Sequence, residues 1–306
     1  MESKIIIACV LSWYTFSMLQ TVIDQRFFVK YPCPLTISFS HMVINSFSLA
    51  IATIVSGEQK LFVSRENLVP ILGLAVFKFL VSVFSHYTAL LLPVPLMEAC
   101  KSLAPVFVVV FTSIVYGTKY PNKILFSVLI MISGVFLATL TQTKIVYEGL
   151  FTVVLMILSS QSKNLATKHM FQTVDLHPFG ILFNVHFFAI FMILPLWIMI
   201  DLPFLVTSKD LQDKPMQFAY TMVTQGFLSS FLHIIKATIL SNVSSLTYSV
   251  IENGKSLSKT ILGFAVYQKP TGILNLFGTF LAVVGVFYYS QIKSENKDNN
   301  KKQKEN

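Results

Sequence analysis

Two short stretches of the chain place a carboxylate and an ammonium group at a helical spacing. Residues 98–103 and 252–257 share the pattern Glu-x-x-Lys-Ser-Leu, and each lies inside a long apolar segment. Residues three apart share a helix face, so the two charges of each copy project the same way and partly neutralise one another. Inside a bilayer such groups predict a polar cavity, and lysine ammonium groups are good point-charge partners for phosphate.

The depth of each lysine in its segment indicates how costly its burial is. Lys255 lies about eleven residues into its segment, roughly 16 Å deep in a core of about 30 Å, whereas Lys101 lies about six residues in, roughly 9 Å, within reach of the headgroups. A buried lysine costs at least about 2.5–3.5 kcal/mol, so Lys255 is expected to face a partner or a water-filled cavity. Tyr248 precedes this copy by one turn, where its hydroxyl could bind a ligand or pair two helices. The candidate substrate-binding residues of the two stretches are Glu98, Lys101, Tyr248, Glu252, Lys255 and Ser256.

A polar run interrupts the apolar segment 149–172. Residues 159–164 are Ser-Ser-Gln-Ser-Lys-Asn, and no lipid-facing helix carries such a run, so one face is expected to look into the helix bundle. Lys163 is predicted to face the cavity. Lys168 and His169 lie in the last turn, where basic residues also suit a helix C-terminus and the membrane interface, so a binding role and a structural role both stay open for them.

Two further pairs of basic residues lie in other apolar segments. Lys78 and His86 are two helical turns apart, and His233 and Lys236 are three residues apart on one helix face. Either pair could add basic groups to the cavity, although a structural role is the simpler interpretation for His86.

The composition is that of a membrane protein. Apolar residues make up 54% and charged residues 12% of the 306 residues, and the mean hydropathy is +0.68, values far from those of a soluble chain. The formal charge of +9 has no soluble basic domain to carry it, which argues against nucleic acid as a partner. The three cysteines show neither a disulfide framework nor metal-ligand spacing. No catalytic or nucleotide-binding motif is present, so we expect a non-enzyme without a cofactor or metal.

With about 20 apolar residues per span, the sequence predicts ten membrane-spanning helices. Ten divide as five plus five, so the fourth span corresponds to the ninth, and these two hold the Glu-x-x-Lys-Ser-Leu copies. The expected fold is all-α, a polytopic membrane protein of two five-helix inverted repeats, residues 1–143 and 144–292, followed by a tail at 293–306. The expected spans are roughly residues 5–23, 34–56, 68–92, 95–116, 124–142, 149–172, 178–200, 217–240, 244–267 and 271–290.

An even number of spans places both termini on one side of the membrane, and the lysine-rich tail favours the cytosol. The tail from Ser294 onward is polar, lacks apolar periodicity and is predicted to be disordered. Lys302 and Lys304, fifth and third from the last residue, resemble the dilysine signal that returns membrane proteins to the endoplasmic reticulum. Coat proteins are therefore candidate partners of the tail, although any lysine-rich tail meets so short a pattern fairly often.

Several motifs follow one another along the chain in a recognisable order. They are Trp13-Tyr14, Tyr31-Pro-Cys-Pro-Leu-Thr36, His41-Met42, the segment from Pro93 to Pro105, Lys163-Asn-Leu-Ala-Thr-Lys168, and Ser245-Leu-Thr-Tyr-Ser-Val250 with Lys255. Together they resemble the triose-phosphate and nucleotide-sugar translocator family of the drug/metabolite transporter superfamily. The resemblance covers nearly all of residues 10–292 and is specific to the family, not to one substrate.

The resemblance implies a ten-helix antiporter that exchanges phosphorylated sugars or nucleotide sugars by alternating access. From the plastid sugar-phosphate branch it implies binding through Lys101, Lys168 and Lys255. Ser256 stands where that branch has an arginine, so the fork that would grip phosphate bidentately is lost. Glu98 stands where that branch has a histidine, as in secretory-pathway relatives. Simple triose phosphate is therefore not the expected substrate.

These observations lead to the hypothesis of an antiporter for a nucleotide sugar or sugar phosphate, a multi-pass protein of the endoplasmic reticulum or Golgi membrane. Lys101 and Lys255 would hold the phosphate, and Glu98 and Glu252 would keep the empty site near neutral. Two alternatives stay open: a proton-coupled metabolite or drug exporter that titrates one of these glutamates, and a non-transporting regulator of secretory traffic. The sequence leaves the substrate, the counter-substrate and the formation of a homodimer open.

Overall fold

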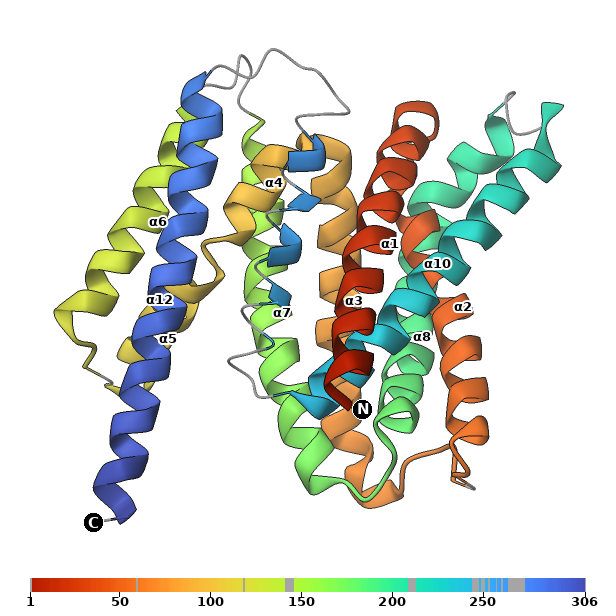
Figure 1. The fold of residues 1–306 in the computed structure, drawn as a ribbon. Helices are drawn as coiled ribbons and strands as arrows, with labels where there is room; N and C mark the ends of the chain where they lie inside the picture. The colour runs from red at the N-terminus through yellow and green to blue at the C-terminus, as the bar shows by residue number, and fades with distance from the viewer. Residues whose placement is uncertain are drawn as a thin grey trace. The chain divides into compact units, whose positions relative to one another are not determined.

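The described part of the chain is built from α-helices and contains no strand (Figure 1). The computed structural model describes residues 2–305 except 59, 118, 141–145, 209–212, 244–247, 249, 250, 253, 257, 260 and 264–272. Helices are the expected outcome, because a segment in lipid must satisfy its backbone hydrogen bonds internally. The helices are α1 (Glu2–Lys30), α2 (Pro34–Val55), η1 (Arg65–Asn67), α3 (Leu68–Leu91), α4 (Val94–Lys101), α5 (Ala104–Tyr116), α6 (Asn122–Leu140), α7 (Tyr147–Thr173), α8 (Pro178–Thr207), α10 (Pro215–Asn242) and α12 (Ile273–Glu305).

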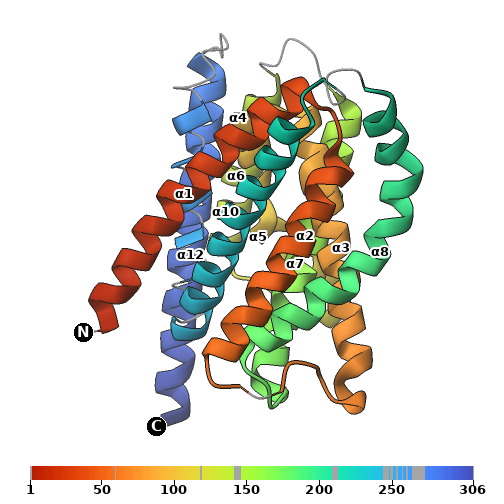
Figure 2. The same cartoon turned by 90° about the vertical axis from the view of Figure 1, so that its right-hand side faces the viewer.

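These helices pack into two units, and each unit draws on both halves of the sequence. Unit 1 comprises residues 1–91 and 159–241, and unit 2 comprises residues 92–158 and 242–306. In unit 1, α2 and α8 contact each other and run side by side (Figure 2). In unit 2, α12 packs along α6, as Figure 1 shows. The predicted repeats, 1–143 and 144–292, divide the chain by sequence correspondence and not by packing, and their inverted relation stays a prediction.

Length and composition make five of the described helices candidates to cross a membrane. They are Ile5–Lys30, Pro34–Val55, Arg65–Leu91, Pro178–Thr207 and Pro215–Asn242. α6 and α12 contain shorter apolar stretches. Large apolar side chains such as Phe47, Val69 and Ile114 are more than half exposed, which suits contact with lipid and not with water. The prediction of an all-α, polytopic membrane protein is confirmed.

The fourth predicted span, 95–116, is broken into two helices. α4 ends at Lys101 and α5 begins at Ala104. Pro105 explains the break, because it has no N–H to donate and its ring crowds the carbonyl four residues earlier, that of Lys101. The Leu103 N–H donates instead to the carbonyl three residues earlier at 3.0 Å. The continuous helix predicted over 95–116 is therefore wrong, and the break lies within the first Glu-x-x-Lys-Ser-Leu copy.

α8 continues to Thr207, beyond the end of the predicted span 178–200. Asp201 lies inside α8 and is 4% exposed. The Thr36 N–H and hydroxyl both donate to Asp201 Oδ2, at 2.7 and 2.9 Å. The first N–H groups of a helix have no partner within it, so this carboxylate caps α2 from a neighbouring helix. The predicted end of this span at residue 200 is therefore too early, because Asp201 is held inside the bundle.

In the last part of the chain, the structure tests the prediction for the tail but only part of the prediction for the ninth span. The predicted ninth span, 244–267, falls in large part outside the described residues, and the residues described within it are helical. α12 continues to Glu305, so the stretch that contains Lys302 and Lys304 is helical where the sequence predicts disorder. Lysine, glutamate and glutamine are favourable helix formers, and extending an existing helix requires no new nucleus.

Candidate functional site

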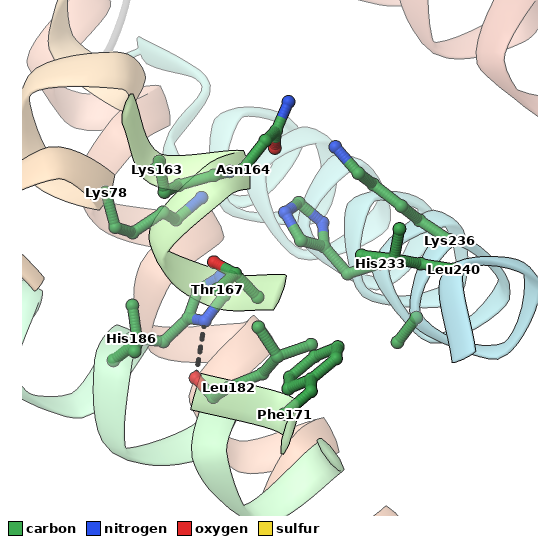
Figure 3. Close-up of a pocket in the computed structure, with 12 residues that line it drawn as sticks. Lys78, Lys163, Asn164, Thr167, Phe171, Leu182, His186, His233, Lys236 and Leu240 are labelled. Carbon is green, nitrogen blue, oxygen red and sulfur yellow. Dashed lines mark hydrogen bonds between the residues drawn. The ribbon is translucent and has the colours of Figure 1, made fainter. Parts of the chain in front are cut away.

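Helices α3, α7, α8 and α10 of unit 1 enclose a cavity with basic groups on its wall (Figure 3). α3 contributes Lys78, α7 Lys163, α8 His186, and α10 His233 and Lys236. In Figure 3 the Lys78 and Lys236 side chains approach the cavity from opposite sides. The other polar lining residues are Asn164 and Thr167, and the rest of the wall is apolar.

The charges around this cavity favour an anion. Lys78 is 7% exposed and interacts electrostatically with Lys236 and with the two lining imidazoles. No carboxylate is found among the described residues that line the cavity. Ammonium groups that face one cavity repel each other, so a bound anion relieves a cost that the empty site carries. A metal cation does not suit this wall, and no three His, Cys, Asp or Glu side chains gather as ligands in the described part of the chain.

Polar contacts between α2 and α10 fix the position of His233. Asn45 of α2 is fully buried. Its Nδ2 donates to Ser229 Oγ at 3.3 Å, and its Oδ1 accepts from Ser230 Oγ at 2.7 Å. The Ser229 carbonyl in turn accepts from His233 Nδ1 at 2.9 Å. A buried amide satisfied at both ends sets the register of the two helices, and this register brings His233 to the cavity.

In unit 2 the first Glu-x-x-Lys-Ser-Leu copy forms the ion pair that its spacing predicts. Lys101 Nζ lies 2.8 Å from Glu98 Oε1, with side chains that are 30% and 3% exposed. The Ser256 hydroxyl of the second copy donates to the other oxygen of Glu98. Lys259, which occupies the place of Pro105 in the second copy, is close enough to Glu98 to interact with it electrostatically. The predicted Glu98–Lys101 pair is confirmed, and the two copies meet at this carboxylate.

The other predicted site residues are divided between the two units. In unit 2, Tyr248 is 6% exposed, and its hydroxyl donates to Glu252 Oε1 at 3.4 Å. Lys255 is helical and partly buried. In unit 1, Lys168 is also partly buried but is not among the residues that line the cavity, whereas Lys163 is.

The sequence alone identifies few of the residues that line the cavity as strong candidates. Lys78, His233 and Lys236 are weaker candidates than the repeated motif, and His186 is not singled out. A signal was available for each of them, because an ionisable residue within an apolar span is a functional candidate by default. The sequence could not show which of these residues share a cavity, since they come from helices far apart along the chain.

Along most of its length the chain is similar to plant phosphate translocators. It is 23% identical to phosphoenolpyruvate/phosphate translocator 1, a chloroplastic protein of Arabidopsis thaliana, over 92% of this chain and 70% of that protein. It is 21% identical to the xylulose 5-phosphate/phosphate translocator of the same plant, over 93% of this chain and 69% of that protein. A probable sugar phosphate/phosphate translocator of Arabidopsis thaliana is 22% identical over 95% of this chain and 96% of that protein.

A likeness in three dimensions and a family match complete the comparison. A crystal structure of a protein superposes on the chain with a TM-score of 0.58 at 12% identity, over 94% of this chain and 96% of that one, which shows the fold alone. The family model described as Triose-phosphate Transporter family matches residues 4–290. This match agrees with the resemblance that the motifs carry, and the chain therefore belongs to the Triose-phosphate Transporter family.

Proposed function

We propose that this protein is a secondary transporter that exchanges phosphorylated organic anions, with phosphate as a counter-substrate, across an endomembrane by alternating access. The observation that carries the proposal is the unit-1 cavity, where Lys78, Lys163 and Lys236 converge and no carboxylate lies among the described lining residues. Exchange follows from the charge: a cavity with facing ammonium groups is costly to reorient when empty, and an anion removes that cost. The similar proteins named as phosphoenolpyruvate/phosphate and xylulose 5-phosphate/phosphate translocators support the same substrate class.

The names of the similar proteins favour a sugar phosphate over a nucleotide sugar as the transported anion. The family resemblance offers Lys101, Lys168 and Lys255 as alternative substrate contacts, and none of the three is among the described residues that line this cavity.

We also propose that the protein resides in the endoplasmic reticulum or Golgi membrane with both termini in the cytosol. The support is the lysine-rich tail with Lys302 and Lys304, which would bind coat proteins. Replacing both lysines by alanine should move a tagged protein to later compartments of the secretory pathway. An unchanged location in that variant would remove the argument for retrieval.

Exchange in proteoliposomes tests the proposed activity. Purified protein is reconstituted into vesicles loaded with phosphate, and uptake of labelled phosphate is competed with sugar phosphates, phosphoenolpyruvate and nucleotide sugars. We expect uptake that requires internal phosphate and that sugar phosphates inhibit. Uptake driven by a pH gradient without any internal counter-substrate would indicate the proton-coupled exporter instead, and no uptake with any member of the panel would favour the non-transporting regulator.

A single variant separates binding from folding in this assay. Lys78→Met removes the repulsion between Lys78 and Lys236, so the ligand-free Tm should hold or rise, while phosphate exchange falls by about tenfold to 100-fold because a charged hydrogen-bond donor is lost. Lys123→Met is the matched control, because Lys123 is exposed at the start of α6. A variant that lowers the Tm and leaves exchange intact would contradict the placement of the substrate in this cavity.

A further inference from the structure

One face of α10 carries a line of polar residues through the interior of unit 1. Gln225, Ser229, His233 and Lys236 follow one another at intervals of four, four and three residues, so they share one helix face over about 16 Å. His233 and Lys236 line the unit-1 cavity. Gln225 lies at the opposite end of the line and is not among the described residues that line the cavity. The polar face of α10 therefore continues beyond the cavity into the helix bundle.

Gln225 is a buried amide whose hydrogen-bonding groups the described protein does not satisfy. Its side chain is 0% exposed, and neither Oε1 nor Nε2 has a hydrogen-bond partner in the described structure. Asn45 of α2 is equally buried, but its two amide ends contact Ser229 and Ser230. An unpartnered buried amide costs free energy, and proteins commonly satisfy such groups with ordered water.

His41 of α2 lies at the same level of the bundle as Gln225. α2 and α10 run in the same direction (Figure 2), and Asn45 contacts Ser229 between them. His41 and Gln225 each lie four residues before that contact, so they occupy matching positions on the two helices. His41 is 4% exposed, and its Nε2 also has no hydrogen-bond partner within the part of the chain that the structure describes.

We propose that unit 1 binds internal water between α2 and α10, held by the amide of Gln225 and by Nε2 of His41. These groups supply three polar atoms without a partner in the described structure, and a buried water uses about two to four. Water both donates and accepts, so it satisfies the amide and the imidazole together. The His41 ring meets that of His86 with centroids 5.4 Å apart, so this water joins the polar face of α10 to the histidine pair of α2 and α3.

The interface between α6 and α12 in unit 2 has the opposite character. A Cβ atom at Gly134 would collide with the backbone of α12, and one at Gly285 would collide with Met131. Met131 is 0% exposed and packs among apolar side chains such as Val286. Close-packed helices of this kind resist displacement. Water-mediated contacts exchange partners readily, so α10 can shift against α2 without leaving buried polar atoms unpartnered.

Radiolytic labelling of the purified protein in detergent tests for the bound water. X-ray pulses convert bound water into hydroxyl radicals, which oxidise adjacent side chains even where bulk solvent does not reach. In the wild type, His41 should be oxidised about tenfold faster than Met42 and Met131, although methionine is the more reactive side chain. Both methionines are 0% exposed, and Met42, the next residue of α2, packs in an apolar cluster with Leu35 and Ala189.

Two substitutions of Gln225 supply the matched control. Gln225→Asn keeps an amide and should retain the labelling of His41. Gln225→Met keeps the length of the side chain without its polar atoms and should reduce that labelling to the level of Met42.

The Tm of Gln225→Met separates a hydrated amide from a dry one. Replacing a dry, unpartnered amide would raise the Tm, because two buried polar atoms are removed. Replacing a hydrated amide removes partners from the water, so we expect the Tm to fall by about 2 °C.

Each failure has a distinct meaning. Oxidation of His41 that is no faster than that of Met42 in the wild type would overturn the proposal. Unchanged labelling of His41 in Gln225→Met, or a higher Tm of that variant, would overturn the assignment of the water to Gln225. If the methionine variant does not fold, the wild-type labelling ratio decides alone. None of these measurements depends on transport, so a failure of the exchange assay leaves this inference unaffected.

Discussion

Units 1 and 2 each contain a cluster of lysines within apolar helices, but the surroundings of the two clusters differ in charge. In unit 2, the carboxylate of Glu98 is contacted by Lys101 and Ser256, so its charge is compensated within the chain. In unit 1, Lys78 and Lys163 line a cavity whose described wall holds no carboxylate. A compensated buried pair fixes the packing of helices, whereas basic groups gathered around one cavity favour an anion.

This difference separates two kinds of lysine in apolar segments, those with and those without a carboxylate on the same helix face. Lys101 and Lys255 each follow a glutamate by three residues, so a partner on the same helix face is available to both. Lys78, Lys163 and Lys236 have no acidic residue three or four positions away in the sequence. On the proposed function, we expect the spacing to the nearest carboxylate to be a better guide to a ligand site within a membrane span than the repetition of a motif.

The largest effect is expected from a contrast within α7. Lys163→Met should lower the rate of phosphate exchange at low substrate concentration by about 100-fold, because a charge-assisted contact to phosphate is lost. Lys168→Met, five residues later on the same helix, should cause a loss at least about ten times smaller, because Lys168 does not line the cavity.

A larger loss of exchange in Lys168→Met than in Lys163→Met would contradict the placement of the ligand in unit 1. If Lys168→Met is the more damaging change, the family resemblance and not the unit-1 cavity locates the phosphate. Thermal melts of both variants without ligand show whether a loss of exchange comes from a loss of folded protein.

The sequence predicts the helical architecture well because lipid removes most alternatives. Apolar segments of about 20 residues must form helices in a bilayer, and most of the described helices lie close to their predicted spans. The errors have local causes. The break before Ala104 follows from Pro105, a signal that is readable in the sequence. The buried position of Asp201 is not readable, because its partner Thr36 lies on a different helix, far away in the sequence.

The candidate site is less predictable than the fold for the same reason. The Glu98–Lys101 pair is local, so its spacing is enough to predict it. The unit-1 cavity joins α3, α7, α8 and α10, and one sequence contains no information on which faces of four separate helices meet. His186 illustrates the limit, since it lines this cavity and no motif in the sequence points to it.

A double-mutant cycle in unit 2 tests whether the Glu98–Lys101 pair stabilises the fold. Lys101→Met leaves the carboxylate of Glu98, which is 3% exposed, with fewer partners, and should lower the free energy of unfolding by about 2 kcal/mol, a value reduced for the partial exposure of Lys101. Adding Glu98→Gln should recover at least half of that loss, because no buried charge then remains unpaired. Denaturant melts in detergent measure the coupling, and strictly additive effects would show that the pair is not a stabilising unit.

The smallest effect is expected at the contact between the two motif copies. Ser256→Ala removes the hydroxyl that donates to Glu98 and should lower the free energy of unfolding by about 1 kcal/mol, the usual cost of losing one such donor. Ser256→Thr is the matched control, because it keeps the hydroxyl, and its free energy of unfolding should stay close to that of the wild type.

Phosphate titrations of the same two proteins complete the test. If the alanine variant loses phosphate affinity without losing stability, the unit-2 cluster binds ligand as well, and the contrast between a structural pair and a ligand cavity fails. If stability falls and the threonine variant retains it, the hydroxyl acts through Glu98, and the carboxylate is held in place by both copies of the motif.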